Sequence, residues 1–181
     1  NHYAVVHIGE QTWMAENLKT NKYRNEESIP NVTENSEWGA LTTGAWCHYF
    51  NNVENDAKYG KLYNWYAIND ARKIAPEGWH VPTEVDWSTL ENYLIANGFN
   101  YDGTTDGNKI PKALAANFDW NPSSGEGTIG NDLTKNNSSG FSGLPGGYRD
   151  LFGAFVSPGN NGIWWSLSES DETNAWSRYL Y

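Results

Sequence analysis

The first residues of the chain form two short apolar runs around a turn, a pattern that predicts a β-hairpin. Residues 3–8 are rich in apolar and β-branched side chains, Gly9 opens a turn, and residues 13–15 are apolar again. Two short β-prone runs around a turn are typical of a hairpin. We therefore predict a hairpin over residues 3–15 and a further short strand over residues 46–50. Residues 20–44 lack a sustained period, which predicts an ordered loop.

Two later segments have the three- and four-residue spacing of apolar side chains that predicts a helix. The first covers residues 59–69. The second follows Thr83, which can cap the helix because Asp86 comes three residues later, and it ends at Gly98. Its apolar stripe consists of Trp87, Leu90, Tyr93 and Leu94. A short third helix is predicted over residues 109–117, with Leu114 pointing inward.

The second half of the chain has a different pattern. Residues 97–140 are mostly Asn, Gly, Ser, Thr and Asp, and they predict a long irregular loop region. Short β-prone runs follow, separated by Gly or Asn turns, at residues 141–144, 147–149, 154–156, 163–166 and 175–179. Two main helices followed by short antiparallel strands predict an α+β fold. No repeat or linker divides the chain, so residues 1–181 are predicted to form a single domain.

Composition and charge narrow the classes of protein that fit this pattern. The chain has 181 residues, ten of them Trp, and a net charge of −10. The acidic balance argues against nucleic acid as a partner, because phosphate binding depends on Lys and Arg. No apolar run approaches the roughly 18 residues that a transmembrane helix needs, which predicts no transmembrane segment. Cys47 is the single cysteine, so a disulfide-bonded scaffold is excluded.

Five motifs follow one another along the whole chain. They are Gln11-Thr-Trp-Met-Ala-Glu-Asn-Leu-Lys19, Tyr59-Gly-Lys-Leu-Tyr-Asn-Trp-Tyr-Ala67, Pro76-Glu-Gly-Trp-His-Val-Pro-Thr83 with Trp87, Gly140-Phe-Ser-Gly-Leu-Pro-Gly-Gly-Tyr-Arg149 and Trp164-Trp-Ser-Leu-Ser-Glu169. Together they resemble the Fibrobacter succinogenes major paralogous domain family. The segment from residue 79 to 87 is also distantly similar to formylglycine-generating-enzyme-like domains.

The resemblance implies several properties. It implies a C-type-lectin-like fold with short twisted strands, and an extracellular or cell-surface location in bacteria, often within a larger surface protein. Relatives usually carry a cysteine just before the Pro-x-Gly-Trp segment and another near the C-terminus, which would pair; here Ala75 stands at the first position. A last family strand is expected beyond Tyr181.

The residues indicate no catalytic site. The four histidines lack metal-binding spacing, and a Gly-x-Ser-x-Gly motif is absent. Residues 125–130 match Gly-x-Gly-x-x-Gly, but no buried strand precedes them and Glu126 would repel a phosphate. Cys47 lies in an aromatic run and is predicted to be a small buried side chain. We expect that the protein is not an enzyme.

A calcium site is a candidate in the loop region. Asp102, Thr104 and Asp106 stand at positions one, three and five of an EF-hand-like loop, Gly107 stands at six, and Asn108 extends the alternation. The acid expected at position twelve is Ala113, so the loop is incomplete. The pattern therefore predicts either a structural calcium ion or a turn in which Asx side chains bond their own backbone.

Aromatic and polar side chains in the C-terminal loops predict a binding site. Sugars stack on aromatic rings and bond polar side chains, and the candidate residues are Trp120, Tyr148, Arg149, Trp164, Trp165, Glu169 and Trp176. Strand alternation turns one of the adjacent Trp164 and Trp165 rings inward and the other outward, while Arg149 could instead form a structural ion pair. The remaining motif-borne tryptophans at 13, 65, 79 and 87 are expected in the core. The sequence therefore predicts an adhesion module for a glycan or a cell-surface protein, and the alternative is a structural or assembly domain without a small ligand.

Overall fold

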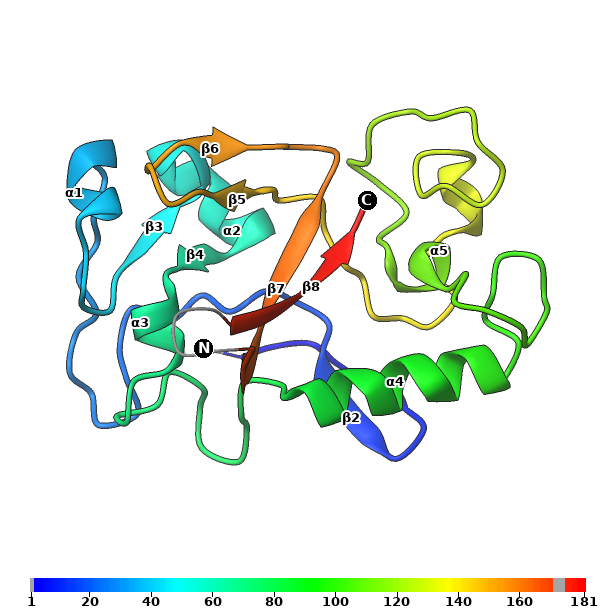
Figure 1. The fold of residues 1–181 in the computed structure, drawn as a ribbon, viewed down its shortest axis with the longest axis horizontal. Coiled ribbons are helices and arrows are strands. Elements are labelled where there is room, and N and C mark those ends of the chain that lie inside the picture. The colour runs from blue at the N-terminus through cyan, green and yellow to red at the C-terminus, as the bar shows by residue number, and fades with distance from the viewer. Residues whose placement is uncertain (1, 171–174) are drawn as a thin grey trace.

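The computed structural model describes residues 2–170 and 175–181, which form a mixed α and β fold with few helices (Figure 1). Its strands are β1 (Val5–Ile8), β2 (Gln11–Met14), β3 (Trp46–His48), β4 (Lys61–Tyr63), β5 (Tyr148–Arg149), β6 (Phe155–Val156), β7 (Gly162–Glu169) and β8 (Ala175–Leu180). Its α-helices are α1 (Asn35–Gly39), α2 (Asp56–Tyr59), α3 (Trp65–Ile68), α4 (Glu84–Ala96) and α5 (Pro111–Leu114). Short 3₁₀ turns cover Tyr49–Asn51, Val53–Asn55 and Leu133–Lys135.

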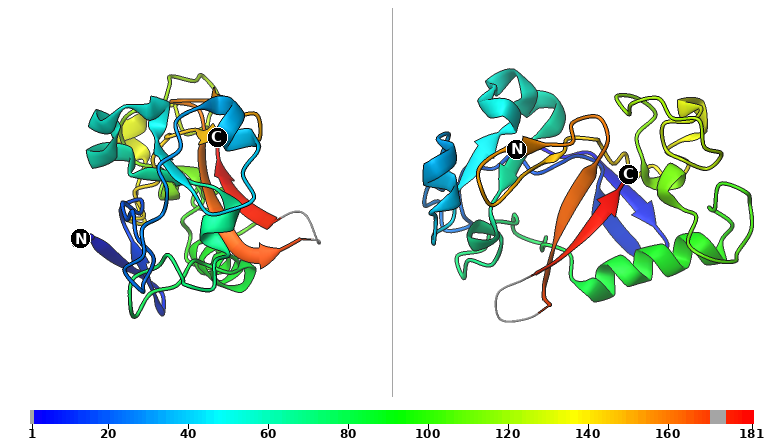
Figure 2. Two further views of the ribbon diagram at one scale, coloured as in Figure 1. Left: turned by 90° about the vertical axis from the view of Figure 1, so that its left-hand side faces the viewer. Right: turned by 45° about the horizontal axis from the view of Figure 1, so that its top comes forward.

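The strands form four antiparallel pairs, and each sheet in the described part of the chain has two strands. The predicted N-terminal hairpin is confirmed, with Val6 opposite Trp13 and Ile8 opposite Gln11. The β1–β2 and β7–β8 hairpins lie on opposite sides of the molecule in the left-hand view of Figure 2. An isolated two-stranded hairpin is only marginally stable in water, so the fold depends on what packs between the pairs.

Helix α4 is confirmed with its predicted capping box, but Tyr93 of the predicted apolar stripe is exposed. The Oγ1 of Thr83 accepts a hydrogen bond from the Asp86 N–H at 3.3 Å, and the Asp86 carboxylate accepts one from the Thr83 N–H at 2.8 Å. This reciprocal capping box satisfies two amides at the helix start. The helix buries Trp87, Leu90 and Leu94. Arg178 of β8 binds its outer face through Glu84 and Glu91, at 2.8 and 2.7 Å.

The predicted helix over residues 59–69 is wrong. Gly60 has a φ of 67°, which ends the single turn of α2. Residues 61–63 then form β4 and pair with β3, and the Asn64 side chain caps a new turn, α3, by accepting from the Ala67 N–H. Pairing with a strand far back in the sequence outweighs the local helical spacing here. The described chain therefore has one helix of 13 residues instead of two main helices.

Other predicted elements are confirmed only in part. Residues 46–48 form β3, but residues 49–51 turn into a 3₁₀ helix. The third predicted helix is the single turn α5, and Leu114 is buried as expected. The loop over residues 20–44 contains the short helix α1. Residues 141–144 form no strand, because Gly143 alone bridges to Ala115.

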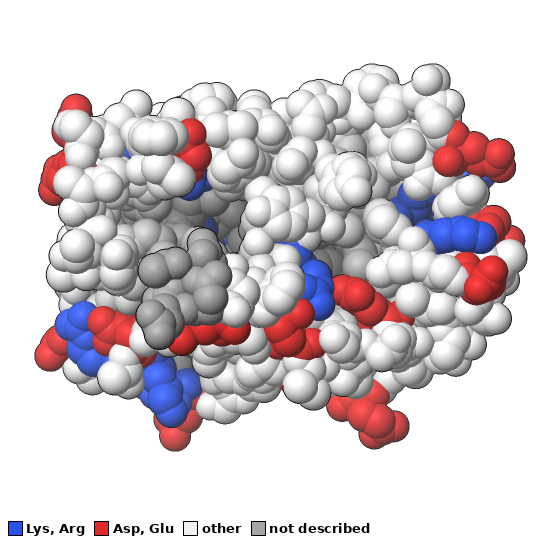
Figure 3. Space-filling view, viewed as in Figure 1, with Lys and Arg blue, Asp and Glu red and all other residues white. Residues whose placement is uncertain are grey.

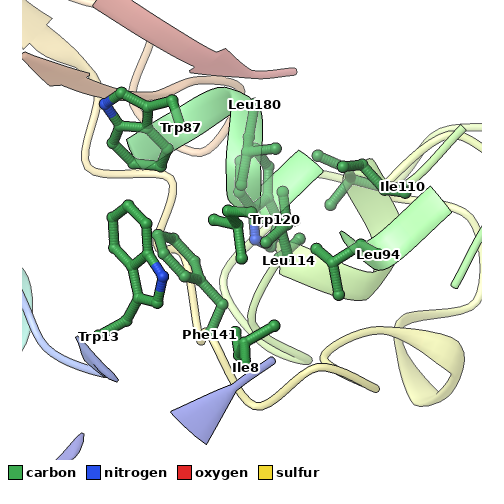
Figure 4. Packing of buried hydrophobic residues seen from close by; sticks show 12 residues of the cluster. Ile8, Trp13, Trp87, Leu94, Ile110, Leu114, Trp120, Phe141 and Leu180 are labelled. Carbon is green, nitrogen blue, oxygen red and sulfur yellow. The ribbon is translucent and has the colours of Figure 1, made fainter. Parts of the chain in front are cut away.

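The buried apolar residues form three separate clusters. The largest joins β1, β2, α4, α5 and the C-terminal end of β8, and includes Ile8, Leu90, Leu94, Leu114 and Leu180 (Figure 4). Within it, the ring centroids of Trp13 and Trp87 are 4.8 Å apart. The second cluster surrounds Trp46 and Ile68, and the third surrounds Trp38 and Cys47. Cys47 is confirmed as a small buried side chain, and burial raises the pKa of its thiol.

A buried lysine organises the polar loop that follows α5. The Nζ of Lys112 donates hydrogen bonds to the carbonyl oxygens of Thr128 at 3.2 Å, Ile129 at 3.5 Å and Asp132 at 3.3 Å, and also to that of Asn131. Only 5% of the Lys112 surface is exposed. The Lys112 ammonium therefore binds four carbonyls of the loop at one point, much as a metal ion binds carbonyls in other loop-rich domains.

We expect the substitution Lys112→Met to lower the free energy of unfolding by about 1–3 kcal/mol, because the Asn131 carbonyl loses its donor and the carbonyls of Thr128, Ile129 and Asp132 each lose one of two. Lys135→Met is the matched control, since Lys135 lies in the same segment with an exposed side chain; its change should stay within about 0.5 kcal/mol. Urea unfolding followed by tryptophan fluorescence measures both. Equal losses for the two variants would contradict the proposed role of the Lys112 ammonium.

Candidate functional site

A cavity of about 570 Å³ lies where the three clusters approach one another. Its wall comprises the run 11–18 of β2 and the following loop, β4, residues 79–82, the start of α4, much of the segment 141–149, and residues 163–165 of β7. This volume is within the range of roughly 300–1,000 Å³ typical of ligand sites. The face of the molecule in Figure 3 is hollowed left of centre, and residues without charge form most of the rim.

Aromatic rings form a large part of the cavity wall. Trp164 packs against the first cluster, with its ring centroid 6.0 Å from that of Phe141, and Trp165 packs against the second, 5.6 Å from Trp65. Strand alternation thus sends the two rings to different clusters, and the expected outward-facing ring is not found. Neither ring is fully exposed, because both are half-buried in the wall. Trp13, Trp79 and Trp87 line the same cavity.

Most polar side chains of the wall already have partners within the chain. Asn17 accepts from the Trp164 Nε1 at 2.9 Å and donates to the Tyr59 carbonyl at 3.0 Å. Glu16 pairs with Lys19 at 2.7 Å, and Lys61 pairs with Asp56. Although burial acts against it, hydrogen bonds from Thr83 lower the pKa of Asp86, which keeps this helix-capping carboxylate ionised.

One donor of the wall is an exception. The Nε1 of Trp87 is buried and has no hydrogen-bond partner among the described residues. The Trp87 side chain is only 4% exposed. In Figure 4 this nitrogen lies on the side of the ring that is turned away from Leu94 and Ile110. A buried N–H without an acceptor costs about 1–3 kcal/mol, so a group that accepts from it would be stabilised at this position.

The structure brings together four of the seven predicted ligand residues. Tyr148, Arg149, Trp164 and Trp165 line the cavity. Trp120 does not: it is 4% exposed and lies inside the first cluster, so its ring offers no surface to a ligand. Glu169 accepts a hydrogen bond from Asn69 at the surface, and Trp176 is half exposed on β8, away from the cavity wall.

The guanidinium of Arg149 has a structural environment. It donates to the carbonyls of Val32 and Thr33, each at 2.7 Å, and to that of Gly153 at 2.9 Å. It also stacks on Trp38, with 4.4 Å between the guanidinium carbon and the ring centroid. The alternative that Arg149 forms a structural contact is thus supported, although its partners are carbonyls and rings instead of an acid.

We expect Arg149→Lys to lower the free energy of unfolding by about 2 kcal/mol or more, because an ammonium cannot reproduce the planar fork or the stacking. Lys22→Arg is the control, since Lys22 forms its ion pair with Glu26 on the surface and such pairs contribute little. Chemical unfolding measures both changes. If Arg149→Lys leaves the stability unchanged, the structural role is contradicted and Arg149 remains a candidate ligand-binding residue.

The candidate calcium loop contains an ion pair. The Asp102 carboxylate accepts from the Thr104 N–H at 3.1 Å and hydroxyl at 2.6 Å, and from the Lys109 ammonium at 2.6 Å. Asp106 is exposed, and the amide of Asn108 reaches Glu91 at 3.5 Å. No group of three or more His, Cys, Asp or Glu side chains that could hold a metal ion occurs in the described residues. The geometry is that of the Asx turn, and the lysine supplies the positive charge.

Several carboxylates have a lowered pKa, and the largest shifts are those of two aspartates. A hydrogen bond from Arg72 lowers the pKa of Asp70 from 3.8 to about 2, and hydrogen bonds from Lys109 and Thr104 lower that of Asp102 to the same value. Because the folded-state pKa lies below the unfolded one, both carboxylates stabilise the fold above about pH 4, and this contribution is lost as the pH falls towards 2.

We therefore expect the melting temperature to fall between pH 4 and pH 2, and to fall less steeply in the variant carrying both Asp70→Asn and Asp102→Asn. Asp106→Asn is the control, because the Asp106 carboxylate forms no ion pair in residues 2–170 and 175–181. Calorimetry over this pH range measures the slopes. Parallel slopes for the double variant and the unsubstituted protein would contradict the assignment.

Sequence reasoning missed the edge of β2 as part of the site. The sequence predicts a motif over residues 11–19 and a hairpin over residues 3–15, but it does not indicate that all of residues 11–18 line the cavity. The signal was the motif itself, because polar Gln11 and Asn17 flank apolar positions without continuing the strand alternation. Their partners, Asp86 and Tyr59, lie far away in the sequence and could not be inferred from it.

The fold and cavity define a mixed α and β domain built from short strand pairs around an aromatic site. Comparison with protein families matches residues 6–181 to the Fibrobacter succinogenes major domain, and the chain belongs to this family. Neither the curated proteins nor the solved structures include a significant match to the chain. Within the described residues, no helix has the length and apolar character to cross a membrane.

Proposed function

We propose that this domain is a non-catalytic binding module of a bacterial surface or secreted protein, and that its ligand occupies the central cavity. The observation that supports it is the aromatic wall, to which Tyr148, Trp164 and Trp165 contribute from the C-terminal half. Binding sites are typically concave, mostly apolar and furnished with few polar groups. The thiol of Cys47 is buried outside the cavity wall, and the Asp86 carboxylate of the wall is engaged by Thr83 and His80, which supports a role without catalysis.

We further propose that the fold is C-type-lectin-like. One 13-residue helix, short strand pairs and a long irregular region over residues 97–147 support this assignment, together with the motif spacing. In this arrangement β2, the segment 141–149 and β7 surround the cavity that the ligand would occupy, and the start of α4 contributes to its wall. The ion pair of Lys109 with Asp102 and the carbonyl contacts of Lys112 support an ordering of this region without a calcium ion.

A glycan is the first candidate ligand, and a protein partner is the second. Exposed faces of Tyr148 or Trp165 would suit the apolar face of a sugar ring. A specific observation favours the protein: Asn17 and Glu16, which would bond sugar hydroxyls, already have partners within the chain. This observation favours a protein partner, as in an assembly domain, over a carbohydrate ligand.

The test is a glycan array and a panel of extracellular peptides, each probed with and without calcium. We expect saturable binding that Tyr148→Ala weakens about three- to tenfold, the loss of one aromatic contact, while EDTA changes nothing. Trp176→Ala is the control, because Trp176 is equally aromatic and half exposed but lies outside the cavity wall. Loss of binding in Trp176→Ala alone would move the site to the outer face of β8.

A further inference from the structure

We propose that the cavity receives an extended, uncharged peptide strand of a partner protein, which pairs with the free edge of β2 and accepts the Trp87 N–H. This inference rests on the proposed function, because it names the class of ligand for the same cavity. Three features support it: outward-facing backbone groups of β2, the Trp87 indole nitrogen without a partner among the described residues, and charged wall residues that are already paired.

The backbone of β2 presents hydrogen-bonding groups away from β1. The Ala15 N–H donates to the Ala4 carbonyl at 2.9 Å, so this pair is hydrogen-bonded. Hydrogen-bonded and non-bonded pairs alternate along an antiparallel ladder. Val6 and Trp13 therefore form the next bonded pair, while Thr12 and Met14 direct their N–H and C=O groups outward. Since Thr12 and Met14 line the cavity, an added strand would find a ready edge there.

The indole of Trp87 supplies a donor beside this edge. The ring centroids of Trp87 and Trp13 are 4.8 Å apart, so the indole that carries the unpartnered Nε1 packs against a side chain of the strand whose edge is open. A main-chain carbonyl of the added strand would satisfy it. Trp120 has an unpartnered and equally buried Nε1 in the same cluster, but it does not line the cavity. The indole nitrogens of Trp87 and Trp120 are thus matched donors, and only that of Trp87 belongs to a residue of the cavity wall.

The charges of the wall indicate what the strand carries. Lys61, Glu16 and Arg149 are each engaged within the chain, by Asp56, by Lys19 and by carbonyls respectively. A charged side chain brought into the cavity would find no free counterion and would be costly to bury. The open surface consists of rings and main chain, which suits alternating apolar side chains on about five residues, the usual length of a strand.

The experiment uses the 181-residue chain and eight-residue peptides in which Val, Ile or Phe alternates with Thr or Ser. The matched negative probes have the same side chains but N-methylated amides at alternate positions, which blocks strand pairing. Amide hydrogen exchange and the indole N–H resonances are followed by NMR, and affinities by calorimetry. Oligosaccharides of glucose and N-acetylglucosamine form a second arm.

We expect saturable binding of an unmethylated peptide, loss of binding on methylation, slower exchange of the Thr12 and Met14 amides, and a downfield shift of the Trp87 indole proton. Trp87→Phe should weaken binding roughly tenfold, the effect of one hydrogen bond, and Trp120→Phe should leave affinity unchanged. Since either variant could lower stability, the indole shift in the unsubstituted protein gives an independent readout.

Other outcomes overturn the inference in distinguishable ways. Binding that survives N-methylation would exclude strand pairing. A saccharide that shifts the Trp87 indole while no peptide does would overturn the strand but leave the binding function in place. Protection of the Thr12 and Met14 amides by a segment of the same polypeptide, in the protein at its native length, would overturn the assignment to a partner. No response in either arm would overturn both proposals.

Discussion

Main-chain carbonyl groups in the loops impose the constraint on which this structure depends. Helices and strand pairs are short, so many carbonyls inside the molecule lack partners from regular secondary structure, and buried carbonyls need a donor. Cationic side chains supply it. Arg24 donates to the carbonyls of Ala75, Pro76 and Trp79. Lys112 donates to four carbonyls of residues 128–132. Arg149 donates to the carbonyls of Val32, Thr33 and Gly153. Each cation ties segments that are distant in sequence, and this orders long loops without a disulfide in the described residues.

The same use of cations explains the charge distribution of the site. The chain has 12 Lys and Arg against 22 Asp and Glu, and several of the cations are engaged inside the molecule. Others are paired near the cavity, as Lys61 is with Asp56 and Lys19 with Glu16. The acidic excess therefore appears on the surface, while the cavity wall consists of rings and main chain with little free charge. The cavity wall has little free charge because its Lys and Arg side chains are bonded to loop carbonyls or paired with acids.

What the sequence predicted correctly was encoded locally. The capping box of Thr83 and Asp86 and the turn at Gly9 each lie within a few residues, and both α4 and the first hairpin are confirmed. The helix over residues 59–69 failed because its true partner, β3, is more than ten residues away, and strand pairing overrode a helical spacing. Trp120 failed as a ligand residue because a polar loop sequence does not reveal that its one large ring turns into the core.

The site itself could be predicted only in part for the same reason. Trp164 and Trp165 are predicted as aromatic residues among polar loops, but Trp13 and Met14, which line the same cavity, come from the other end of the chain. No local signal relates segments about 150 residues apart. The motif at residues 11–19 showed that the hairpin matters without showing what it faces, and the orphaned Trp87 nitrogen is visible only in three dimensions.

Strand β7 connects the two larger clusters, and this gives the cavity its physical significance. Trp164 completes the cluster built on the N-terminal hairpin and α4, whereas the adjacent Trp165 completes the cluster around Trp46. Each sheet that contributes to these clusters has two strands, and an isolated two-stranded sheet has only marginal stability in water. An occupant of the cavity would contact both clusters at once and add apolar burial to each. Anything that binds only the folded state raises its stability by mass action, so ligand binding and the cohesion of the two halves should be coupled in this domain.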